Sequence, residues 1–578
     1  MQELKVEAYR SLFHLRADKD NYALIPTSIL GEYGALDAYY NKKLEEFLLD
    51  SIPSDLRHLR EIITYLTIVF TEAEISGIAV DVNVFNLLDE SYGSMLDKMS
   101  EKSLLFDSVK LFISKKIGPI REKNERARKK KLSEKEMVEE VFTMTKRLAM
   151  TEVMFNKDYL GMPVLKKTKG GKDGKNKVAS TDQEAIELLH RYPKLNQDQR
   201  IFIDNLADYR TIDKLRSTYV LPVIDRYVDN LYRQEFMIPG TVTGRLSSGF
   251  HTLPRSSDIK NMYISRWRDQ GGLILGFDFS QLELRVLACL SKEPKMIDAF
   301  LNHVDIHAKT GGEIAGKPWD KITPEERSTG KTTNFAIIYG KTADTLKDDL
   351  HVTRERAQEI IDSVLGGYNM VASWMQDRYK ELEDFGGIKT LFGREIPIPE
   401  YYLDGKGFEE DAKRRSVNYP IQSTASDLVN SGIMRLHKRY RLLRLRSIIL
   451  AAIHDAAYSD LKPGELFTLI SLMKKTLEAE TIDMYSWLVC PIEIDISLGV
   501  SMGNSIKLEV AEIEENRALL NGKGSRKDIN MLLATGGLAY NMKFYLEKEK
   551  EVDKSEFTID RVMLDPIEWK GKLEITQK

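Results

Sequence analysis

LGFDFSQLELRVLA (275–288) is the stretch of sequence that decides the fold, because it places one acid, Asp278, at the end of an apolar run. The run that leads into Asp278 is typical of a buried strand, and the residues that follow are typical of a helix. Residues 273–290 are therefore predicted to be a strand followed by a helix. A carboxylate at the end of a buried strand is a common structural feature, so a functional role for Asp278 depends on which other residues accompany it.

A second acid, Asp455, follows another strand-like run in SIILAAIHDAAYSD (447–460). The apolar residues on both sides of His454-Asp455 predict a hairpin with this pair at its tip. Between the two acids in the chain lies RSTGKTTNFAIIYG (327–340), which is basic and aromatic. Two carboxylates that can share a pair of divalent cations, with a basic helix for a polyphosphate, form the equipment of metal-assisted phosphoryl transfer.

The basic segment also shows its own geometry. Thr323-Pro-Glu-Glu326 predicts a capping box with proline at the first helical position. The residues that then recur at every fourth position form one stripe: Arg327, Lys331, Phe335 and Tyr339. At a rise of roughly 1.5 Å per residue, the first and third are about 12 Å apart, comparable to a nucleoside triphosphate from its tail to its sugar. An amphipathic helix with a cationic edge explains the spacing, but not the choice of residues.

The composition excludes several classes of protein. The chain has 578 residues, 42% hydrophobic and 30% charged, which indicates several globular subdomains. No apolar run reaches about 18 residues, and the N-terminus has no apolar signal core, so neither a membrane association nor secretion is predicted. The two cysteines favour a reducing compartment, and we expect a cytoplasmic protein. The net charge of −3 means that any affinity for nucleic acid depends on local clusters of basic residues.

In order, spacing and residue identity, the three segments resemble motifs A, B and C of the family A DNA polymerases, the DNA polymerase I family. The resemblance covers about residues 20–505. It implies an α+β right-hand fold in which a mostly helical thumb and fingers surround an antiparallel-sheet palm. It also implies template-directed addition of deoxynucleoside triphosphates to a primer 3′-hydroxyl, with release of pyrophosphate, in DNA replication or repair. The expected domains are an exonuclease remnant (1–50), thumb (51–235), palm with motif A (236–290), fingers (291–414), palm with motif C (415–509) and a C-terminal extension (510–578).

The resemblance assigns a role to each residue that matches a family motif. Asp278 and Asp455 are the implied catalytic residues and hold two Mg²⁺ ions, with the backbone carbonyl of Phe279 as a further ligand. The implied nucleotide-binding residues are Arg327, Lys331, Phe335, Tyr339, His307 and Glu283, of which Glu283 is the steric gate against a ribose 2′-hydroxyl. Contacts to primer-template DNA are implied for Arg245 in GTVTGRLSS (240–248), Arg210, Lys214, Arg414, Asn418, Gln422 and His454.

One position departs from the family pattern. Motif C reads His-Asp-Glu in the family but His454-Asp455-Ala456 here. Asp460 cannot replace the missing acid, because four strand residues carry it roughly 13 Å away. We expect activity to survive, with altered handling of metal. Two alternatives stay open: a degenerate, non-catalytic DNA-binding scaffold, and a specialised reverse transcriptase or terminal transferase.

The N-terminal and basic segments give further expectations. Tyr33 and Asp37 match a Tyr-x-x-x-Asp motif of the family's 3′–5′ exonuclease domain, but the other carboxylates of that site are not in this chain. We therefore expect no complete exonuclease site in this chain. Two explanations stay open: the chain is a fragment of a longer enzyme, or the exonuclease is a separate polypeptide that contacts residues 1–50. A bacteriophage source, which would place the protein in the cytoplasm of a bacterial host, is favoured over a bacterial repair enzyme. The basic segment 166–177 predicts a thumb tip that grips phosphates, with a solvated loop as the alternative.

Overall fold

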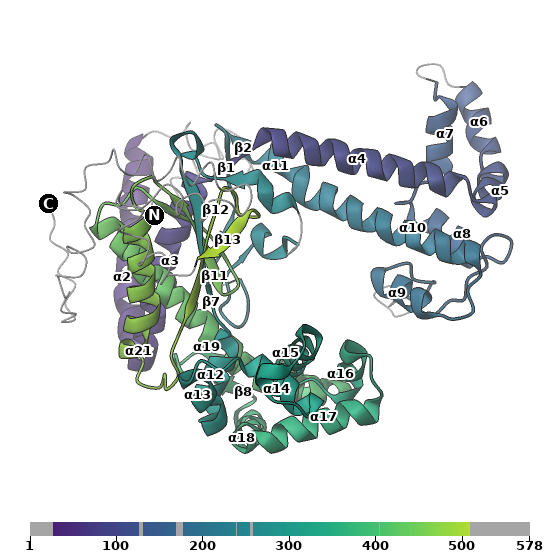
Figure 1. Ribbon diagram of the computed structural model, residues 1–578. Coiled ribbons are helices and arrows are strands. Elements are labelled where there is room, and N and C mark those ends of the chain that lie inside the picture. Colours follow the sequence, from purple (N-terminus) through teal and green to yellow (C-terminus); the bar gives the residue numbers. More distant parts are fainter. Residues whose placement is uncertain are drawn as a thin grey trace, which may run out of the picture. The chain divides into compact units, whose positions relative to one another are not determined.

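The structure is a computed structural model, and it describes residues 27–126, 131–168, 177–238, 240–254, 258–403 and 405–508 (Figure 1). The chain divides into two compact units. Unit 1 comprises Met1–Thr67, Val242–Gly244 and Glu283–Ser431. Unit 2 comprises Ile68–Thr241, Arg245–Leu282 and Gly432–Lys578. The segment 1–26, most of the basic segment 166–177 and the predicted extension 510–578 lie outside the described residues.

Unit 2 contains the predicted palm sheet. Among the described residues, five strands pair in the order β10-β11-β7-β12-β13, and every neighbouring pair is antiparallel. The strands are β7 (Leu273–Phe279), β10 (Ile448–Ile453), β11 (Ala456–Leu461), β12 (Ile494–Gly499) and β13 (Ser505–Leu508). Every residue of the central strand β7 is buried except Asp278, which is exposed. After β11 the chain forms α20 (Leu466–Met473), the π-helix Lys474–Ala479 and α21 (Glu480–Met484), of which the π-helix contacts β12.

A second sheet of unit 2 has the order β2-β3-β1-β6 among the described residues. Its strands are short: β1 (Ile78–Val80), β2 (Tyr227–Val228), β3 (Leu231–Tyr232) and β6 (Tyr263–Ile264). The aromatic rings of Tyr232, Phe250 and Tyr263 pack edge to face or tilted, with centroids 5.1 to 6.0 Å apart. This aromatic cluster also includes Ile274 of β7, so it joins the small sheet to the palm sheet.

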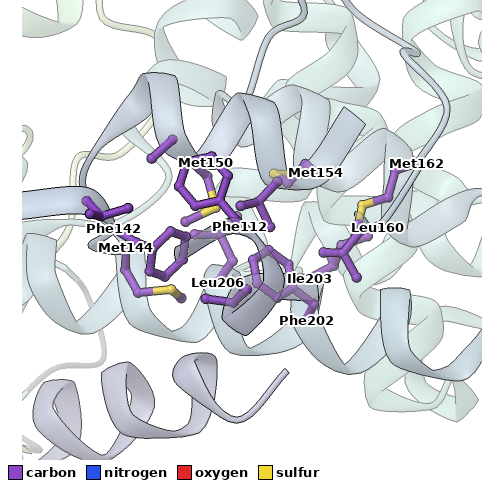
Figure 2. Close-up of a cluster of buried hydrophobic side chains, with 14 of the residues drawn as sticks. Phe112, Phe142, Met144, Met150, Met154, Leu160, Met162, Phe202, Ile203 and Leu206 are labelled. Carbon is purple, nitrogen blue, oxygen red and sulfur yellow. The ribbon is translucent and has the colours of Figure 1, made fainter. Parts of the chain in front are cut away.

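The predicted thumb is a helical arm of unit 2 that starts and ends beside these sheets. Two long helices, α4 (Val82–Leu104) and α10 (Gln197–Lys214), lie side by side and form its shaft (Figure 1). The far end of the arm holds α5 (Asp107–Lys116), α6 (Gly118–Glu125), α7 (Glu134–Val141), α8 (Arg147–Phe155) and α9 (Gln183–Arg191). The methionines Met150 and Met154 pack there against Phe112 and Phe202, all at most 3% exposed (Figure 2). The thumb therefore has a hydrophobic core of its own, which is built from one continuous segment of chain.

Unit 1 is mostly helical and contains the predicted fingers (Figure 1). Its helices after residue 282 are α12 (Leu282–Ser291), α13 (Pro294–Leu301), α14 (Ile306–Ala315), α15 (Pro324–Ile338), α16 (Ala343–Leu350), α17 (Arg354–Gly367) and α18 (Asn369–Phe385). A two-stranded hairpin of β8 (Gly387–Lys389) and β9 (Glu395–Pro397) precedes α19 (Lys406–Leu442), whose last turns belong to unit 2. The N-terminal helix α2 (Thr27–Ser51) and the start of α3 (Arg57–Ser76) also belong to unit 1.

Most expectations about local structure are confirmed. The mostly helical chain with antiparallel sheets has the predicted α+β character, and β7 followed by α12 is the predicted strand and helix. Apolar residues at helical spacing, which include Leu59, Ile62 and Leu66, predict a helix with Ser54 as its N-cap and Gly77 as its stop. That helix is α3, but Ser54 does not cap it. Ser54 instead begins a short 3₁₀ turn, Ser54–Leu56, that follows Pro53 and leads into α3. No helix in the described part of the chain is long and apolar enough to span a membrane.

Candidate active site

The predicted hairpin places the two acids next to each other in one sheet. Strands β10 and β11 flank the two-residue tip His454-Asp455. In the register between β11 and β7, Ala456 lies directly opposite Asp278. The backbone amide of Phe279 donates a hydrogen bond to the carbonyl oxygen of Asp455, with N and O 3.1 Å apart. Two residues that are far apart in the chain therefore lie at one end of adjacent strands, as the sequence predicts.

The surroundings of Asp455 favour a bound cation. Burial raises the pKa of the Asp455 carboxyl, although the positive charges of Arg245 and His454 oppose this. The ring of His454 meets the ring of His251 edge to face, with centroids 5.4 Å apart, and burial lowers the pKa of His251 to about 4. Because burial disfavours the charged form of this carboxylate, a divalent cation bound to it would stabilise the ionised form.

The donor set at the hairpin fits a hard cation. Carboxylate and carbonyl oxygens are the ligands that Mg²⁺ prefers, and Asp278, Asp455 and the carbonyl of Phe279 supply only such oxygens. The structure contains no group of three or more His, Cys, Asp or Glu side chains within the described residues that could hold a metal by itself. A metal bound here would therefore depend on ligands from substrate or water, which is usual for Mg²⁺.

In unit 1, helix α15 carries the predicted stripe of cationic and aromatic residues. Thr323 and Glu326 form the predicted capping box at its start, with proline inside the first turn. Lys331 is exposed, and the Nε atom of Arg327 lies 2.7 Å from a carboxylate oxygen of Asp305. Burial alone would raise the pKa of Asp305, but its hydrogen bonds to Arg327 and the backbone lower it. The guanidinium of Arg327 and the ammonium of Lys331 thus lie one turn apart on the surface of the helix.

Aromatic rings continue the stripe toward the end of α15. The rings of Phe335 and Tyr339 stack, with centroids 6.0 Å apart. The hydroxyl of Tyr339 donates to a carboxylate oxygen of Glu283, 3.3 Å away, and Glu283 is only 6% exposed. The predicted steric gate is therefore held by the last residue of the predicted nucleotide-binding stripe.

His307 lies beside this stripe because helices α14 and α15 cross closely. An added Cβ at Gly330 would be 2.2 Å from the carbonyl oxygen of His307, so only glycine permits the approach. The side-chain amide of Asn334 lies 3.2 Å from Nδ1 of His307, and burial lowers the pKa of His307 to about 4. With Nδ1 accepting from the Asn334 amide, the neutral imidazole carries its proton on Nε2.

Three predicted DNA-contacting residues are spaced four apart on α19 and form one stripe: Arg414, Asn418 and Gln422. Arg414 pairs with Asp411 on the same helix, and Gln422 accepts a hydrogen bond from the hydroxyl of Thr243. Asn418 is 7% exposed, and its side-chain Nδ2 has no hydrogen-bond partner among the described residues. A buried donor without a partner is expensive, which suits a position that a ligand completes.

The two predicted DNA-contacting residues of the thumb differ in burial and hydrogen bonding. The guanidinium of Arg210 donates to the carbonyl oxygen of Thr181 within the thumb, and burial lowers its pKa. Lys214, one turn later on α10, is exposed. Asp37 is exposed on α2, and the side chain of its predicted partner Tyr33 lies outside the described residues.

Sequence reasoning missed several residues around these sites. Asp495 of β12 lies opposite Asp278 in the sheet register, and its carboxylate is 2.9 Å from the ammonium of Lys507. Asp460, by contrast, is excluded from the site as expected, because it is buried and accepts hydrogen bonds from Arg266. The pattern of alternate residues after Pro491 was the available signal for Asp495, since it predicts a strand with Asp495 and Ser497 on one face.

In unit 2 the hairpin presents one acid beside a second acid on the central strand, and in unit 1 helix α15 carries the cationic stripe. These are the elements expected of a right-hand polymerase fold. Comparison with solved structures agrees: the chain is similar to the POL domain of Pol1 from M. smegmatis, solved with DNA primer-template and dNTP. The TM-score is 0.61 and the identity 23%, with 76% of this chain and 70% of that chain covered. The right-hand polymerase fold is thereby confirmed.

The chain belongs to DNA polymerase family A, whose model matches residues 120–504. It is 27% identical to DNA polymerase I of Bacillus subtilis over 82% of this chain and 49% of the relative. It is 30% identical to the thermostable DNA polymerase I of Thermus aquaticus (62% and 41%) and 26% identical to the DNA polymerase of Bacillus phage SP01 (86% and 57%). The chain thus spans about half the length of these curated relatives.

Proposed function

We propose that this chain is a template-directed DNA polymerase that adds deoxynucleotides to a primer 3′-hydroxyl and releases pyrophosphate, in DNA replication or repair. The observation that carries the proposal is the register of the palm sheet, which puts Asp278 opposite the residue that follows Asp455. Membership of DNA polymerase family A supports it. The thumb, palm and fingers bounds predicted from the sequence, and a location in the cytoplasm, are part of the same proposal.

The fingers residues would bind the incoming nucleotide. Arg327 and Lys331 place two positive charges about one helical turn apart, which suits consecutive phosphates of a triphosphate tail. His307 would donate a hydrogen bond from Nε2 to a phosphate oxygen as a neutral group, because its Nδ1 faces Asn334.

The sugar and base would pack against the aromatic end of the stripe. Phe335 offers a ring face to the sugar and base, and Tyr339 fixes the Glu283 carboxylate by a hydrogen bond. A carboxylate held in this way excludes a 2′-hydroxyl by size and by leaving no room for the water that would bridge it. Glu283→Ala is therefore expected to increase ribonucleotide incorporation.

The palm residues would hold the reacting ends. Asp278 and Asp455 would bind two Mg²⁺ ions, which activate the primer hydroxyl and neutralise the leaving pyrophosphate when they are bound. The carboxylates provide the fixed negative charge that draws the cations to the end of the hairpin. Arg245, whose charge acts on Asp455, would test the shape of the last base pair from the minor groove, where readout of sequence is degenerate.

Primer extension tests the proposal. The wild-type chain should extend a primed template in Mg²⁺, and Asp278→Asn or Asp455→Asn should each slow extension by orders of magnitude while the affinity for DNA stays within about twofold. Asp483→Asn is the matched control, because it removes an exposed acid of α21 in the same unit. Near-normal extension by either palm variant would contradict the site.

A non-catalytic DNA-binding scaffold is the second candidate, and Ala456 is the observation that favours it. The same assay separates the two, because a scaffold binds primer-template without extending it. A separate exonuclease polypeptide at residues 1–50 stays a prediction. The exposed apolar side chains of α2, which include Leu36, Tyr40, Leu44 and Phe47, provide a surface for such a partner.

A further inference from the structure

The loop Val242–Gly244 is fastened to helix α19 within unit 1. The hydroxyl of Thr243, which is 3% exposed, donates to the side-chain oxygen of Gln422, 2.9 Å away. The side-chain amide of Asn430, two turns further along α19, lies 3.3 Å from the carbonyl oxygen of Gly244. The loop is thus held at two consecutive residues, immediately before Arg245 in the chain.

A buried ion pair lies against the same loop. The Nη2 atom of Arg394 is 2.7 Å from one carboxylate oxygen of Asp427, and its Nε atom is 3.4 Å from the other. The side chain of Asp427 is fully buried and that of Arg394 is 14% exposed. A pair with two contacts in a low-dielectric site holds the guanidinium plane in one orientation.

Gly244 packs directly on that plane. A Cβ added to Gly244 would be 2.5 Å from Nη2 and 2.6 Å from Cζ of Arg394, and the φ of Gly244 is +77°. Both the missing side chain and the left-handed backbone are therefore needed for the loop to seat on Arg394. The backbone of Arg394 is held in the β8–β9 turn, because its amide donates to the hydroxyl of Thr390, 3.1 Å away.

Arg394 is unsuited to bind DNA itself. Its charge is balanced by Asp427 at short range, and most of its surface is covered. A neutral, buried pair attracts phosphates weakly, whereas it is well placed to hold a backbone. Arg394 would therefore affect the binding of nucleic acid indirectly, by holding the loop Val242–Gly244 in place.

We propose that Arg394 and Asp427 are positioning residues for primer-template recognition, which hold Gly244 and thereby the direction in which Arg245 leaves the loop. This inference rests on the proposed function and on the minor-groove role of Arg245. Arg245 is kept in a tight turn by its own backbone, since its amide donates to Thr241 and its carbonyl accepts from Gly240, at 3.0 and 2.9 Å. A shift of Gly244 therefore moves the base of the Arg245 side chain.

The test compares extension from matched and mismatched primer ends. Arg394→Met should reduce matched extension and the matched-to-mismatched ratio by about tenfold, the factor expected for one lost hydrogen-bonded contact. The KM for the incoming nucleotide should stay within about twofold, since the fingers stripe is untouched. Arg394→Lys, which keeps the charge but loses the paired contacts, should fall between Arg394→Met and the wild type.

A double-mutant cycle tells positioning from general destabilisation. In the Arg245→Ala background, Arg394→Met should change the ratio by less than about twofold, because the group it positions is gone. The matched control is Arg415→Met, which removes a half-buried guanidinium of α19 that pairs with Asp411 of the same helix and with Glu400. The control should leave the matched-to-mismatched ratio unchanged in both backgrounds.

Independent effects of Arg394→Met and Arg245→Ala, or an unchanged ratio in Arg394→Met, would overturn the proposal. If Arg394→Met does not fold, Gly244→Ala tests the same contact from the loop side and should give the same loss of ratio. If the wild-type chain extends no primer, the proposed function fails. The ratio of dissociation constants for matched and mismatched primer-template, measured by fluorescence anisotropy, then still reports on the inference, with the same variants and the same expected nonadditivity.

Discussion

Ala456 stands where the family pattern that motif C resembles has a glutamate. The structure places Ala456 directly opposite Asp278 in the palm sheet, so the two Cβ atoms are about 5 Å apart. A glutamate at this position would reach the cations that Asp278 and Asp455 are proposed to hold. It would also add negative charge beside two carboxylates, which raises their pKa values when metal is scarce.

We therefore expect Ala456→Glu to extend primers as fast as the wild type or faster at saturating Mg²⁺, and more slowly at low Mg²⁺. Single-turnover incorporation across a Mg²⁺ titration measures both effects. A folded variant that is slower at every Mg²⁺ concentration would mean that the palm is adapted to alanine.

His307 makes the free energy of unfolding depend on pH. Burial lowers its pKa to about 4, against about 6.5 in an unfolded chain. Between these values the unfolded state binds more protons, so the stability contribution of the neutral imidazole is complete above about pH 6.5 and is lost as the pH falls toward 4. The full difference is of the order of 3 kcal/mol.

His307→Gln should therefore lower the free energy of unfolding more at pH 7.5 than at pH 4.5. Hydrogen exchange of the α14 amides, compared between variant and wild type at the two pH values, measures the difference. A destabilisation that is equal at both pH values would contradict a buried, neutral histidine.

At the scale of elements, the crossing of α14 and α15 sets the geometry of the proposed triphosphate site. Gly330→Ala would force its Cβ against the carbonyl of His307, so the two helices must separate. We expect the KM for nucleotides to increase at least about tenfold, because His307 and Lys331 would no longer face one phosphate chain. Steady-state kinetics with varied nucleotide measures this.

Gly366 of α17 provides the matched control. It lies in the same unit, is exposed, and has no atom within 4 Å of an added Cβ. Gly366→Ala should leave the KM unchanged and stabilise the helix by about 0.5–1 kcal/mol. An unchanged KM in Gly330→Ala would show that the crossing tolerates a methyl group and does not set the site.

Elements were predictable from the sequence wherever the signal was local. The capping box at Thr323, the hairpin at His454 and the strand before Asp278 each follow from a few adjacent residues. Partners distant in the chain were not predictable. Nothing near Arg394 indicates Asp427, because that pairing depends on how the β8–β9 hairpin packs on α19.

Local patterns can also mislead by one turn. Ser54 has the chemistry of an N-cap, but Pro53 fixes a backbone that begins a 3₁₀ turn first. The helix then starts three residues later, at Arg57, without Ser54 as its cap. Such offsets arise because propensity describes one residue, whereas a boundary depends on how the preceding segment packs.

At the scale of the whole molecule, unit 1 and unit 2 are interleaved along the chain, but the thumb is one continuous segment with its own core. We expect the thumb to open as a separate cooperative unit, because its buried residues pack mainly on one another. Met150→Ala removes a side chain that is 0% exposed and should cost about 2–5 kcal/mol.

Hydrogen exchange should therefore accelerate in the thumb helices α5, α8 and α10 of Met150→Ala, and stay at the wild-type rate in strands β7, β11 and β12. Equal acceleration in the palm strands would mean that thumb and palm unfold together. Ala452→Gly in β10, a small buried truncation in the palm, should give the reverse pattern.

The backbone conformation at the hairpin tip lowers the stability of the protein. His454 has a φ of +55°, a backbone conformation for which hairpins usually select glycine or asparagine. Its side chain is among those expected to contact primer-template DNA, so the tip keeps a residue that its backbone disfavours. A laboratory selection for thermal endurance alone would find replacements at residue 454 early and lose copying efficiency with them. A selection that demands both properties would leave the tip alone and gain its endurance elsewhere, for example in the thumb core.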